Sequence, residues 1–294
     1  MKEVFARHGF TDFEDKLTKS YRVRDYCVQY RETDLNFLQR LLEEEGIYYY
    51  FRHTSSIHTL VLADAYGSLE PYPGYESIDY RPPNDHGQHY DDVIEDWQLA
   101  RNIQTGKYVV NDHDFTKPRA PLITHSLVSR TFPKSNFEMF DYPGKYSALA
   151  EGDHYAKVRL ESLQAQYETV RGSGSARGLA AGSLFTLKGY PRQDQNREYL
   201  IVSATHRLDT GRYDSGEGEA AQTYQCSFEA MHSQRPFRPA QTAVAACVSS
   251  VLPALMVSAF VPVSTVSVRP RRAWDRDPER AVDAPDLQSV FGFE

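Results

Sequence analysis

The chain has 294 residues, of which 40% are hydrophobic and 25% are charged, so it is long enough for about two packed globular domains. Its net charge of -7 argues against a nucleic-acid-binding protein, because neutralising phosphates requires an excess of clustered Lys and Arg. The 3 cysteines lie far apart and form neither a disulfide framework nor a zinc pattern, and the N-terminus lacks a signal-peptide core.

Residues 21–30 alternate in polarity, as a half-buried strand does. Tyr26, Val28 and Tyr30 share one face of this predicted strand, and Cys27 lies on the more polar face. The 20 tyrosines of the chain also favour strands. We therefore expect a mainly β protein.

A helix is predicted from about Thr33 to Glu45, because Thr33 or Asp34 can cap it and Gly46 supplies a left-handed stop. Its apolar positions follow a period of 3.6 and should face the core. These positions are Leu35, Leu38, Leu41 and Leu42.

Three glutamates, Glu43, Glu44 and Glu45, crowd the C-terminal end of this helix. The helix dipole disfavours anions there by about 0.3–1 kcal/mol each. Arg40 can reach Glu44 along the helix, but in the weaker orientation. We therefore predict that at least one of the glutamates is paired with an Arg or Lys outside the helix.

The remaining elements are read from alternation, helical spacing and turn residues. A hairpin is predicted at 47–51 and 57–63, followed by a loop-rich crossing at 71–87. A second helix is predicted from 149 to 167, ending before a flexible Gly-Ser linker at 172–175. Further strands are predicted at 93–99, 105–110, 137–140, 183–188, 199–205 and 222–230.

The composition changes after Pro239, since residues 239–268 carry no charge. A membrane-spanning helix over 243–263 is long enough, but Pro253 and Pro262 weaken that interpretation. The segment 269–294 is charged and contains proline. We expect the tail from 240 to 294 to be disordered and to carry no membrane anchor.

The sequence gives only weak evidence for catalytic or metal-binding groups. His86 and His89 lie in a loop with nearby carboxylates, but structural zinc needs four ligands on a defined scaffold. His113 lies between two aspartates without a recognisable nucleophile, and Cys226 lies on the apolar face of its strand. Gly172, Gly174 and Gly178 do not form a phosphate-binding motif. We therefore predict no catalytic centre, no cofactor and no metal.

One segment, from Tyr26 to Phe51, resembles the VgrG family, the spike proteins of type VI secretion systems, whose pattern is close to QYRE-x-D-x-x-F-x-x-RLLEEEGI followed by aromatics. Looser similarity extends the resemblance over about 21–239. We refer to the matching residues as the signature. They are Gln29, Tyr30, Arg31, Glu32, Asp34, Phe37, Arg40, Leu41, Leu42, Glu43, Glu44 and Gly46.

The resemblance implies an α+β, mainly β fold: a phage tail hub-like β-barrel domain with inserted helices. It further implies a non-enzymatic homotrimeric hub that docks on the Hcp tube and, in a complete spike, carries a PAAR tip protein and effectors. Such a protein is cytoplasmic before firing and afterwards secreted or injected into a target cell. The signature residues would serve structure and assembly.

The chain departs from the family pattern at both ends. We expect residues 1–239 to form a hub-like domain that lacks most of the first barrel, and the tail 240–294 to replace the OB-fold and needle. The hub of a phage or tail-like particle is the alternative interpretation. A cell-wall hydrolase acting through His86, His89 or His113, and a membrane-anchored module, are less favoured.

Overall fold

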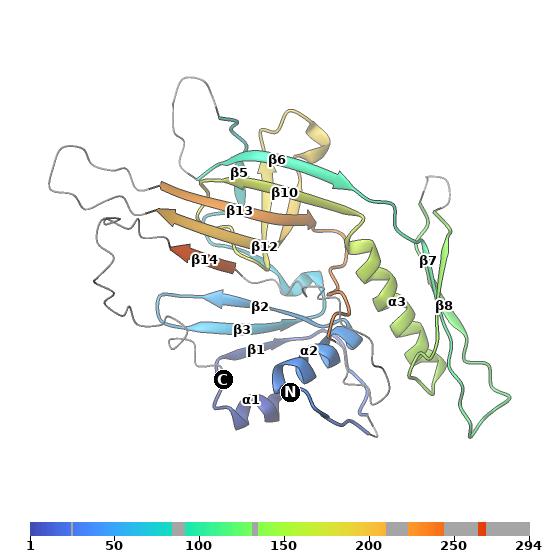
Figure 1. Ribbon diagram of the computed structural model, residues 1–294. Helices are drawn as coiled ribbons and strands as arrows, with labels where there is room; N and C mark the ends of the chain where they lie inside the picture. Colours follow the sequence, from blue (N-terminus) through green and yellow to red (C-terminus); the bar gives the residue numbers. More distant parts are fainter. Residues whose placement is uncertain (25, 84–91, 131–134, 210–222, 244–263, 269–294) are drawn as a thin grey trace, which may run out of the picture.

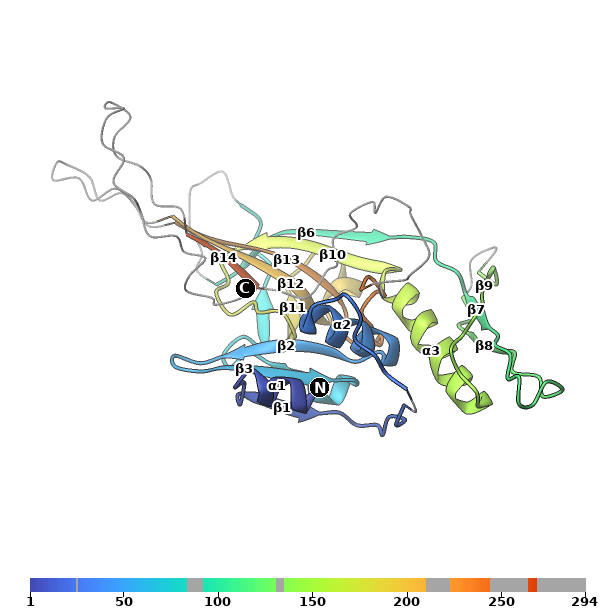
Figure 2. The ribbon, with the colours of Figure 1, turned by 60° about the horizontal axis from the view of Figure 1, so that its bottom comes forward.

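The computed structural model describes the whole chain except residues 25, 84–91, 131–134, 210–222, 244–263 and 269–294. The fold is mostly β, with helices α1 (Lys2–Arg7), α2 (Asp34–Glu45) and α3 (Leu149–Ala165). This confirms the predicted α+β, mainly β class. In both views, a small sheet lies on one side of a large sheet, and a third sheet lies beyond α3 (Figures 1 and 2).

The small sheet contains the predicted hairpin, which is confirmed. Its strand order is β1 (Phe13–Lys16), β3 (His58–Ala63), β2 (Tyr48–His53). β2 and β3 are antiparallel, whereas β1 runs parallel to β3. Tyr48 and Tyr50 project from β2 into a core shared with Leu184 and Leu200 of the large sheet. The hairpin is therefore fixed to the large sheet by buried apolar side chains.

The large sheet is the main element of the fold. Its path is β4 (Glu70–Pro71), β11 (Ser183–Lys188), β12 (Glu198–Asp209), β13 (Thr223–His232), β10 (Glu168–Gly174), β6 (Ile94–Arg101). β5 (Ser77–Asp79) pairs with β11, and β14 (Ser264–Val268) pairs in parallel with β12. The crossing at 71–87 and the tail thus each contribute strands that the sequence did not predict.

Aromatic rings fill the core on one face of this sheet. Trp97 lies 4.8 Å from Tyr199 between ring centres, in an edge-to-face arrangement, and Phe185 and Phe228 surround the pair. The indole Nε1 of Trp97 donates a hydrogen bond of 3.0 Å to Gln195, which is itself buried. A polar partner is what a buried Trp requires.

The predicted Gly-Ser linker at 172–175 is wrong, because residues 172–174 belong to β10. β10 pairs with a strand on each side, β13 and β6. A Cβ atom on Gly172 would lie 2.5 Å from the ring of Phe228 across the strands, and one on Gly174 would clash with the carbonyl of Val93. Glycine serves here for close approach, not for flexibility.

The predicted strand over residues 21–30 is also wrong. Residues 21–24 and 26–30 form no strand in the structure, and Tyr26, Val28 and Tyr30 are exposed. Their alternation does not correspond to a buried face, since none of the described strands pairs with them. Charged side chains of this segment instead contact the helices, as described below.

α3 connects the large sheet to the third sheet. The predicted helix over 149–167 is confirmed as α3, which packs on β8 (Thr124–Leu127), β7 (Lys107–Val110) and β10. β7 pairs with β8 and with β9 (Glu138–Asp141). Among the described residues, no helix combines the length and apolar character that crossing a membrane requires. The candidate span at 243–263 lies, but for Ala243, outside the described residues.

Candidate functional site

The signature residues begin at the turn before α2. Thr33 is the N-cap, and its side chain accepts a hydrogen bond of 3.2 Å from the backbone N–H of Asn36. The buried carboxylate of Glu32 accepts hydrogen bonds from Arg40, at 2.6 Å, and from the amide of Asn36, also at 2.6 Å. The Arg40 hydrogen bond holds the pKa of Glu32 below its usual value. These contacts fix the start of the helix.

Further signature residues support the same turn. Gln29 donates a 2.6 Å hydrogen bond to Asp34, and Arg40 donates one of 2.9 Å to the carbonyl of Val28. Phe37 is half-buried, and the guanidinium of Arg40 lies over its ring, 5.1 Å from the ring centre. Arg31 adopts a left-handed backbone conformation with φ of 49°. The outer part of the signature therefore serves mainly to shape one turn and one helix.

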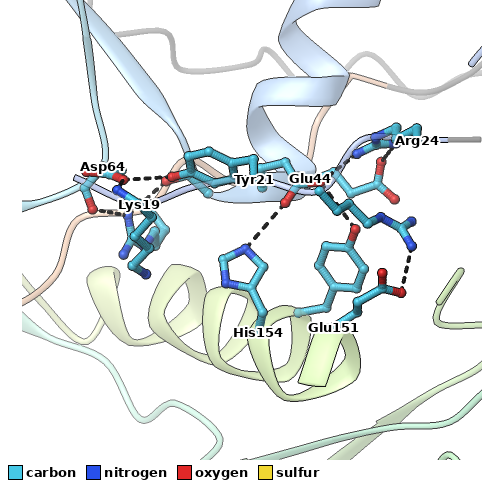
Figure 3. Close-up of polar contacts among 12 residues, drawn as sticks. Lys19, Tyr21, Arg24, Glu44, Asp64, Glu151 and His154 are labelled. Atoms are coloured by element: carbon cyan, nitrogen blue, oxygen red, sulfur yellow. Dashed lines mark hydrogen bonds and ion pairs between the residues drawn. The ribbon is translucent and has the colours of Figure 1, made fainter. Parts of the chain in front are cut away.

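The C-terminal end of α2 has the basic partner that the sequence predicted. Arg24 donates to Glu44 at 2.8 Å and to Glu45 at 2.8 Å. This confirms the prediction that a basic residue outside the helix pairs with the glutamates. Arg24 belongs to residues 17–24, which we call the strap, and it passes beside α2 (Figure 3). The positive charge of Arg24 offsets the unfavourable position of the carboxylates at the negative end of the helix dipole.

Glu45 also joins α2 to α3. Its carboxylate accepts a 3.2 Å hydrogen bond from the hydroxyl of buried Tyr155, and it lies 3.4 Å from Nε2 of His154. Burial alone would raise the pKa of Glu45, but the contacts with His154 and Arg24 outweigh it and lower that pKa. Arg22 of the strap adds an ion pair of 2.7 Å to Glu151 of α3 (Figure 3).

Glu43 has a partner of another kind. Its carboxylate accepts hydrogen bonds from the backbone N–H groups of Thr242 and Ala243, both at 2.9 Å, and from the Thr242 hydroxyl at 3.1 Å. Glu43 is buried although it lies on a helix of mixed polarity. This signature residue thus binds residues 242 and 243, and we call residues 239–243 the exit segment.

Arg238 lies just before the exit segment, and its guanidinium contacts three other parts of the chain. Its guanidinium donates to Glu161 of α3 at 2.8 Å, to the carbonyl of Gly46 at 2.9 Å and to the carbonyl of Asp64 at 2.7 Å. Its side chain is 7% exposed. Arg238 therefore ties α2, β3 and α3 to the exit segment.

Asp64 holds the strap on the opposite side. Its buried carboxylate accepts hydrogen bonds from the N–H groups of Thr18 and Lys19 and from the Tyr21 hydroxyl, at 2.8–3.0 Å (Figure 3). Burial disfavours the ionised carboxylate, but these hydrogen bonds outweigh it and lower the pKa of Asp64. Burial and the Asp64 contact raise the pKa of Tyr21. The strap, α2, α3 and the exit segment together form what we call the α2 junction.

We expect the ionised carboxylate of Asp64 to contribute to the pH dependence of the protein's stability. A lowered pKa in the folded state stabilises the fold above the ordinary Asp value of 3.8 and loses this effect as the pH falls through the folded-state pKa. Asp64→Asn should therefore lower the free energy of unfolding by about 1–3 kcal/mol at neutral pH. The difference from wild type should shrink at about pH 3.

Urea unfolding at both pH values measures this difference. The matched control is Asp79→Asn, because Asp79 is exposed at the end of β5. Its replacement should change stability little at either pH. A wild-type-to-Asp64→Asn difference that stays constant between the two pH values would contradict the assigned role of the carboxylate.

The other sequence candidates do not converge on a site. His86 and His89 lie outside the described residues. The carboxylate of Asp112 accepts hydrogen bonds from the backbone N–H groups of Tyr146 and His113. The side chain of His113 is exposed. Cys226 is fully buried, and burial raises its pKa to about 12, which opposes thiolate formation. No group of His, Cys, Asp and Glu in the described part of the chain could hold a metal ion.

The sequence did not reveal several residues of the α2 junction. Asp64, Glu161, Arg238 and Thr242 are isolated polar residues whose partners lie far along the chain. The Glu triplet was the only sequence signal for the site. Chemically, the junction consists of ion pairs and hydrogen bonds between several chain segments, an arrangement suited to holding elements together.

The chain belongs to the phage tail baseplate hub (GPD) family, whose sequence pattern matches residues 1–211. It is 46% identical over 242 residues to the type VI secretion system spike protein VgrG1b of Pseudomonas aeruginosa, covering 82% of this chain and 32% of that protein. It is also 46% identical over 238 residues to VgrG1a of the same organism, covering 81% and 37%. These matches confirm the resemblance to the VgrG family. The chain spans about a third of the length of these relatives.

A solved structure shows the same fold. It belongs to an E. coli protein described as a component of the type VI secretion system with structural similarity to bacteriophage tail proteins. The TM-score is 0.50 at 19% sequence identity, covering 82% of this chain and 49% of that one. This similarity confirms the tail-hub fold.

Proposed function

We propose that the chain is a structural hub subunit of a type VI secretion spike, without catalysis of its own. The observation that carries this proposal is the 46% identity to spike proteins over 81–82% of the chain. The junction supports the same role, because its charges are engaged with one another and hold chain segments in place.

The assembly we propose is a homotrimer that docks on the Hcp tube and, in a complete spike, carries a PAAR tip protein and effectors. The subunit would reside in the bacterial cytoplasm before firing and leave the cell with the spike. Residues 1–239 form the hub-like unit in this proposal. Glu43 and Arg238 would then set the direction in which the tail 240–294 leaves the hub.

We expect the purified chain to form a trimer, with three times the 33.6 kDa mass of one chain, and to bind purified Hcp. Light scattering after gel filtration measures the mass, and co-sedimentation measures tube binding. In cells, removing the gene should abolish release of Hcp into the medium, and the wild-type gene should restore it. A chain that is monomeric in solution and does not bind Hcp would refute the proposal.

A phage or tail-like particle is the competing context for a hub-family protein. Release of Hcp that does not depend on the gene, together with recovery of the chain in purified tail particles, would favour this context. A chain that cleaves peptidoglycan, and loses this activity in a His86→Ala/His89→Ala/His113→Ala variant that remains folded, would overturn the non-catalytic assignment.

A further inference from the structure

A second charged cluster lies away from the α2 junction, at the corner where the large sheet meets the end of α3. The end of β6, the start of β10 and the end of β13 gather there (Figure 1). The cluster is centred on Glu168, the first residue of β10, whose side chain is 2% exposed. We call it the Glu168 cluster. Its other members are Arg101, Arg130, Tyr167, Arg197 and Arg235.

Glu168 is shared among several cations. Its carboxylate lies 2.7 Å from Nε of Arg101, 2.6 Å from Nη2 of Arg197 and 3.6 Å from Nη2 of Arg235. Burial opposes ionisation of Glu168, but these arginines outweigh it and lower its pKa. A single carboxylate is thus the anionic partner of three guanidinium groups.

Arg130 adds a further positive charge. Its guanidinium lies 4.3 Å from the ring centre of Tyr167, and that of Arg235 lies 4.8 Å from the same ring. The polar partner of Arg130 is the uncharged Gln164, at 2.6 Å. Burial, followed by repulsion from Arg130 and Arg197, lowers the pKa of Arg235 against the attraction of Glu168. The cluster therefore has a positive excess.

Neighbouring acids do not cancel this excess. Asp194 pairs with Arg192 at 2.8 Å, and Glu198 accepts a hydrogen bond of 2.6 Å from Tyr66. Among the described residues, Nη1 of Arg235 and Nε of Arg130 are buried nitrogens without a hydrogen-bond partner. Both atoms are closed to solvent, so an incoming carboxylate would pair with the accessible parts of the arginines, whose side chains are 51% exposed in Arg101, 27% in Arg197 and 21% in Arg235.

We propose that the Glu168 cluster binds an acidic segment of a partner protein, through Asp or Glu side chains that pair with the arginines. Planar guanidinium groups match carboxylates in a fork geometry, and Tyr167 presents an apolar surface beside them. The cluster already pairs guanidinium groups with a carboxylate, Glu168, and an acidic segment would extend this pairing; a nucleic acid is the competing occupant and is tested below. Arg101, whose side chain is 51% exposed, provides access from solvent.

The test uses the full-length chain and a fluorescent hexaglutamate peptide, followed by anisotropy at low and high salt. We expect salt-sensitive binding that weakens about tenfold or more in Arg235→Gln and in Arg130→Gln, because each removes one cation of the excess. Hexalysine should not bind. The matched control is Arg171→Gln, because Arg171 is 77% exposed and pairs with Glu229 elsewhere on the sheet.

Arg101→Gln provides a second variant, since a half-exposed side chain can be replaced without disturbing the core. Thermal unfolding verifies that each variant is folded. Equal affinity for wild type, Arg235→Gln and Arg101→Gln would overturn the proposal, as would tighter binding of a single-stranded oligonucleotide than of hexaglutamate. The result does not depend on the type VI assignment, because the peptide replaces the partner and trimer formation is measured separately.

Discussion

Replacing Arg238 with Ala is expected to lower the free energy of unfolding by about 3–5 kcal/mol, the usual cost of breaking a buried ion pair from one side. The change removes the nearer partner of Glu161, whose other partner Lys157 lies 3.9 Å away, and leaves the carbonyls of Gly46 and Asp64 without their donor. Water cannot readily replace the guanidinium, because its side chain is 7% exposed. Urea unfolding followed by circular dichroism measures the loss.

Arg192→Ala is the matched control. Arg192 is 62% exposed and pairs with Asp194 two residues away, so its removal should cost no more than about 1 kcal/mol. Arg238→Met/Glu161→Gln should recover part of the loss, since it removes the unpaired carboxylate together with the cation. Equal effects of Arg238→Ala and Arg192→Ala would mean that Arg238 does not hold the α2 junction together.

Leu42→Ala is expected to cost about 2–5 kcal/mol, because it leaves a cavity between α2 and the small sheet. Leu42 is 4% exposed and packs with Ile47 and Leu62 in one apolar cluster. Leu35→Ala on the same helix is the control. Leu35 is 60% exposed, so its loss should change stability by no more than about 0.5 kcal/mol.

Thermal and urea unfolding of the two variants measure the contrast. The predicted apolar stripe of the helix is confirmed at Leu38 and Leu42, which are buried, and in part at Leu41, which is half-buried. It is wrong at Leu35, which lies on the outer face of α2 and is exposed. If Leu35→Ala destabilised the protein as much as Leu42→Ala, the outer face of α2 would be packed against something that a single chain does not supply.

The elements predicted correctly are those whose signals are local. The Thr33 cap, the Gly46 stop and the apolar spacing define α2 within one stretch of sequence. The alternation and turn of the β2–β3 hairpin are equally local. In each case, the residues that specify the element also form its stabilising contacts, so the pattern could be read without knowing the rest of the fold.

The predictions that were wrong depend on distant partners. Tyr26 and Val28 alternate like strand residues, but they pair with no strand in the part of the chain that the structure describes. Gly172 and Gly174 suggest a flexible segment, yet the neighbouring strands and the ring of Phe228 require the absence of a side chain there. Composition alone cannot distinguish a glycine that permits motion from one that permits contact.

The site was partly predictable for the same reason. The crowding of Glu43, Glu44 and Glu45 at a helix end required a compensating charge, and Arg24 supplies it. The sequence could not indicate that Glu43 binds backbone N–H groups, or that Arg238 bridges three elements. Those roles exist only once α2, α3 and the exit segment are brought together by the sheets.

The long separations within the α2 junction affect the order in which the chain can fold as it is synthesised. Glu43 and Ala243 are 200 positions apart, and Arg238 and Gly46 are 192 apart. The helix emerges from the ribosome early and can pair with Arg24 at once, but Arg238, Thr242 and Ala243, which bind Gly46 and Glu43, follow 192–200 positions later. Contacts of such sequence separation form slowly and late. The α2 junction can therefore close completely only after residues 238–243 have been made.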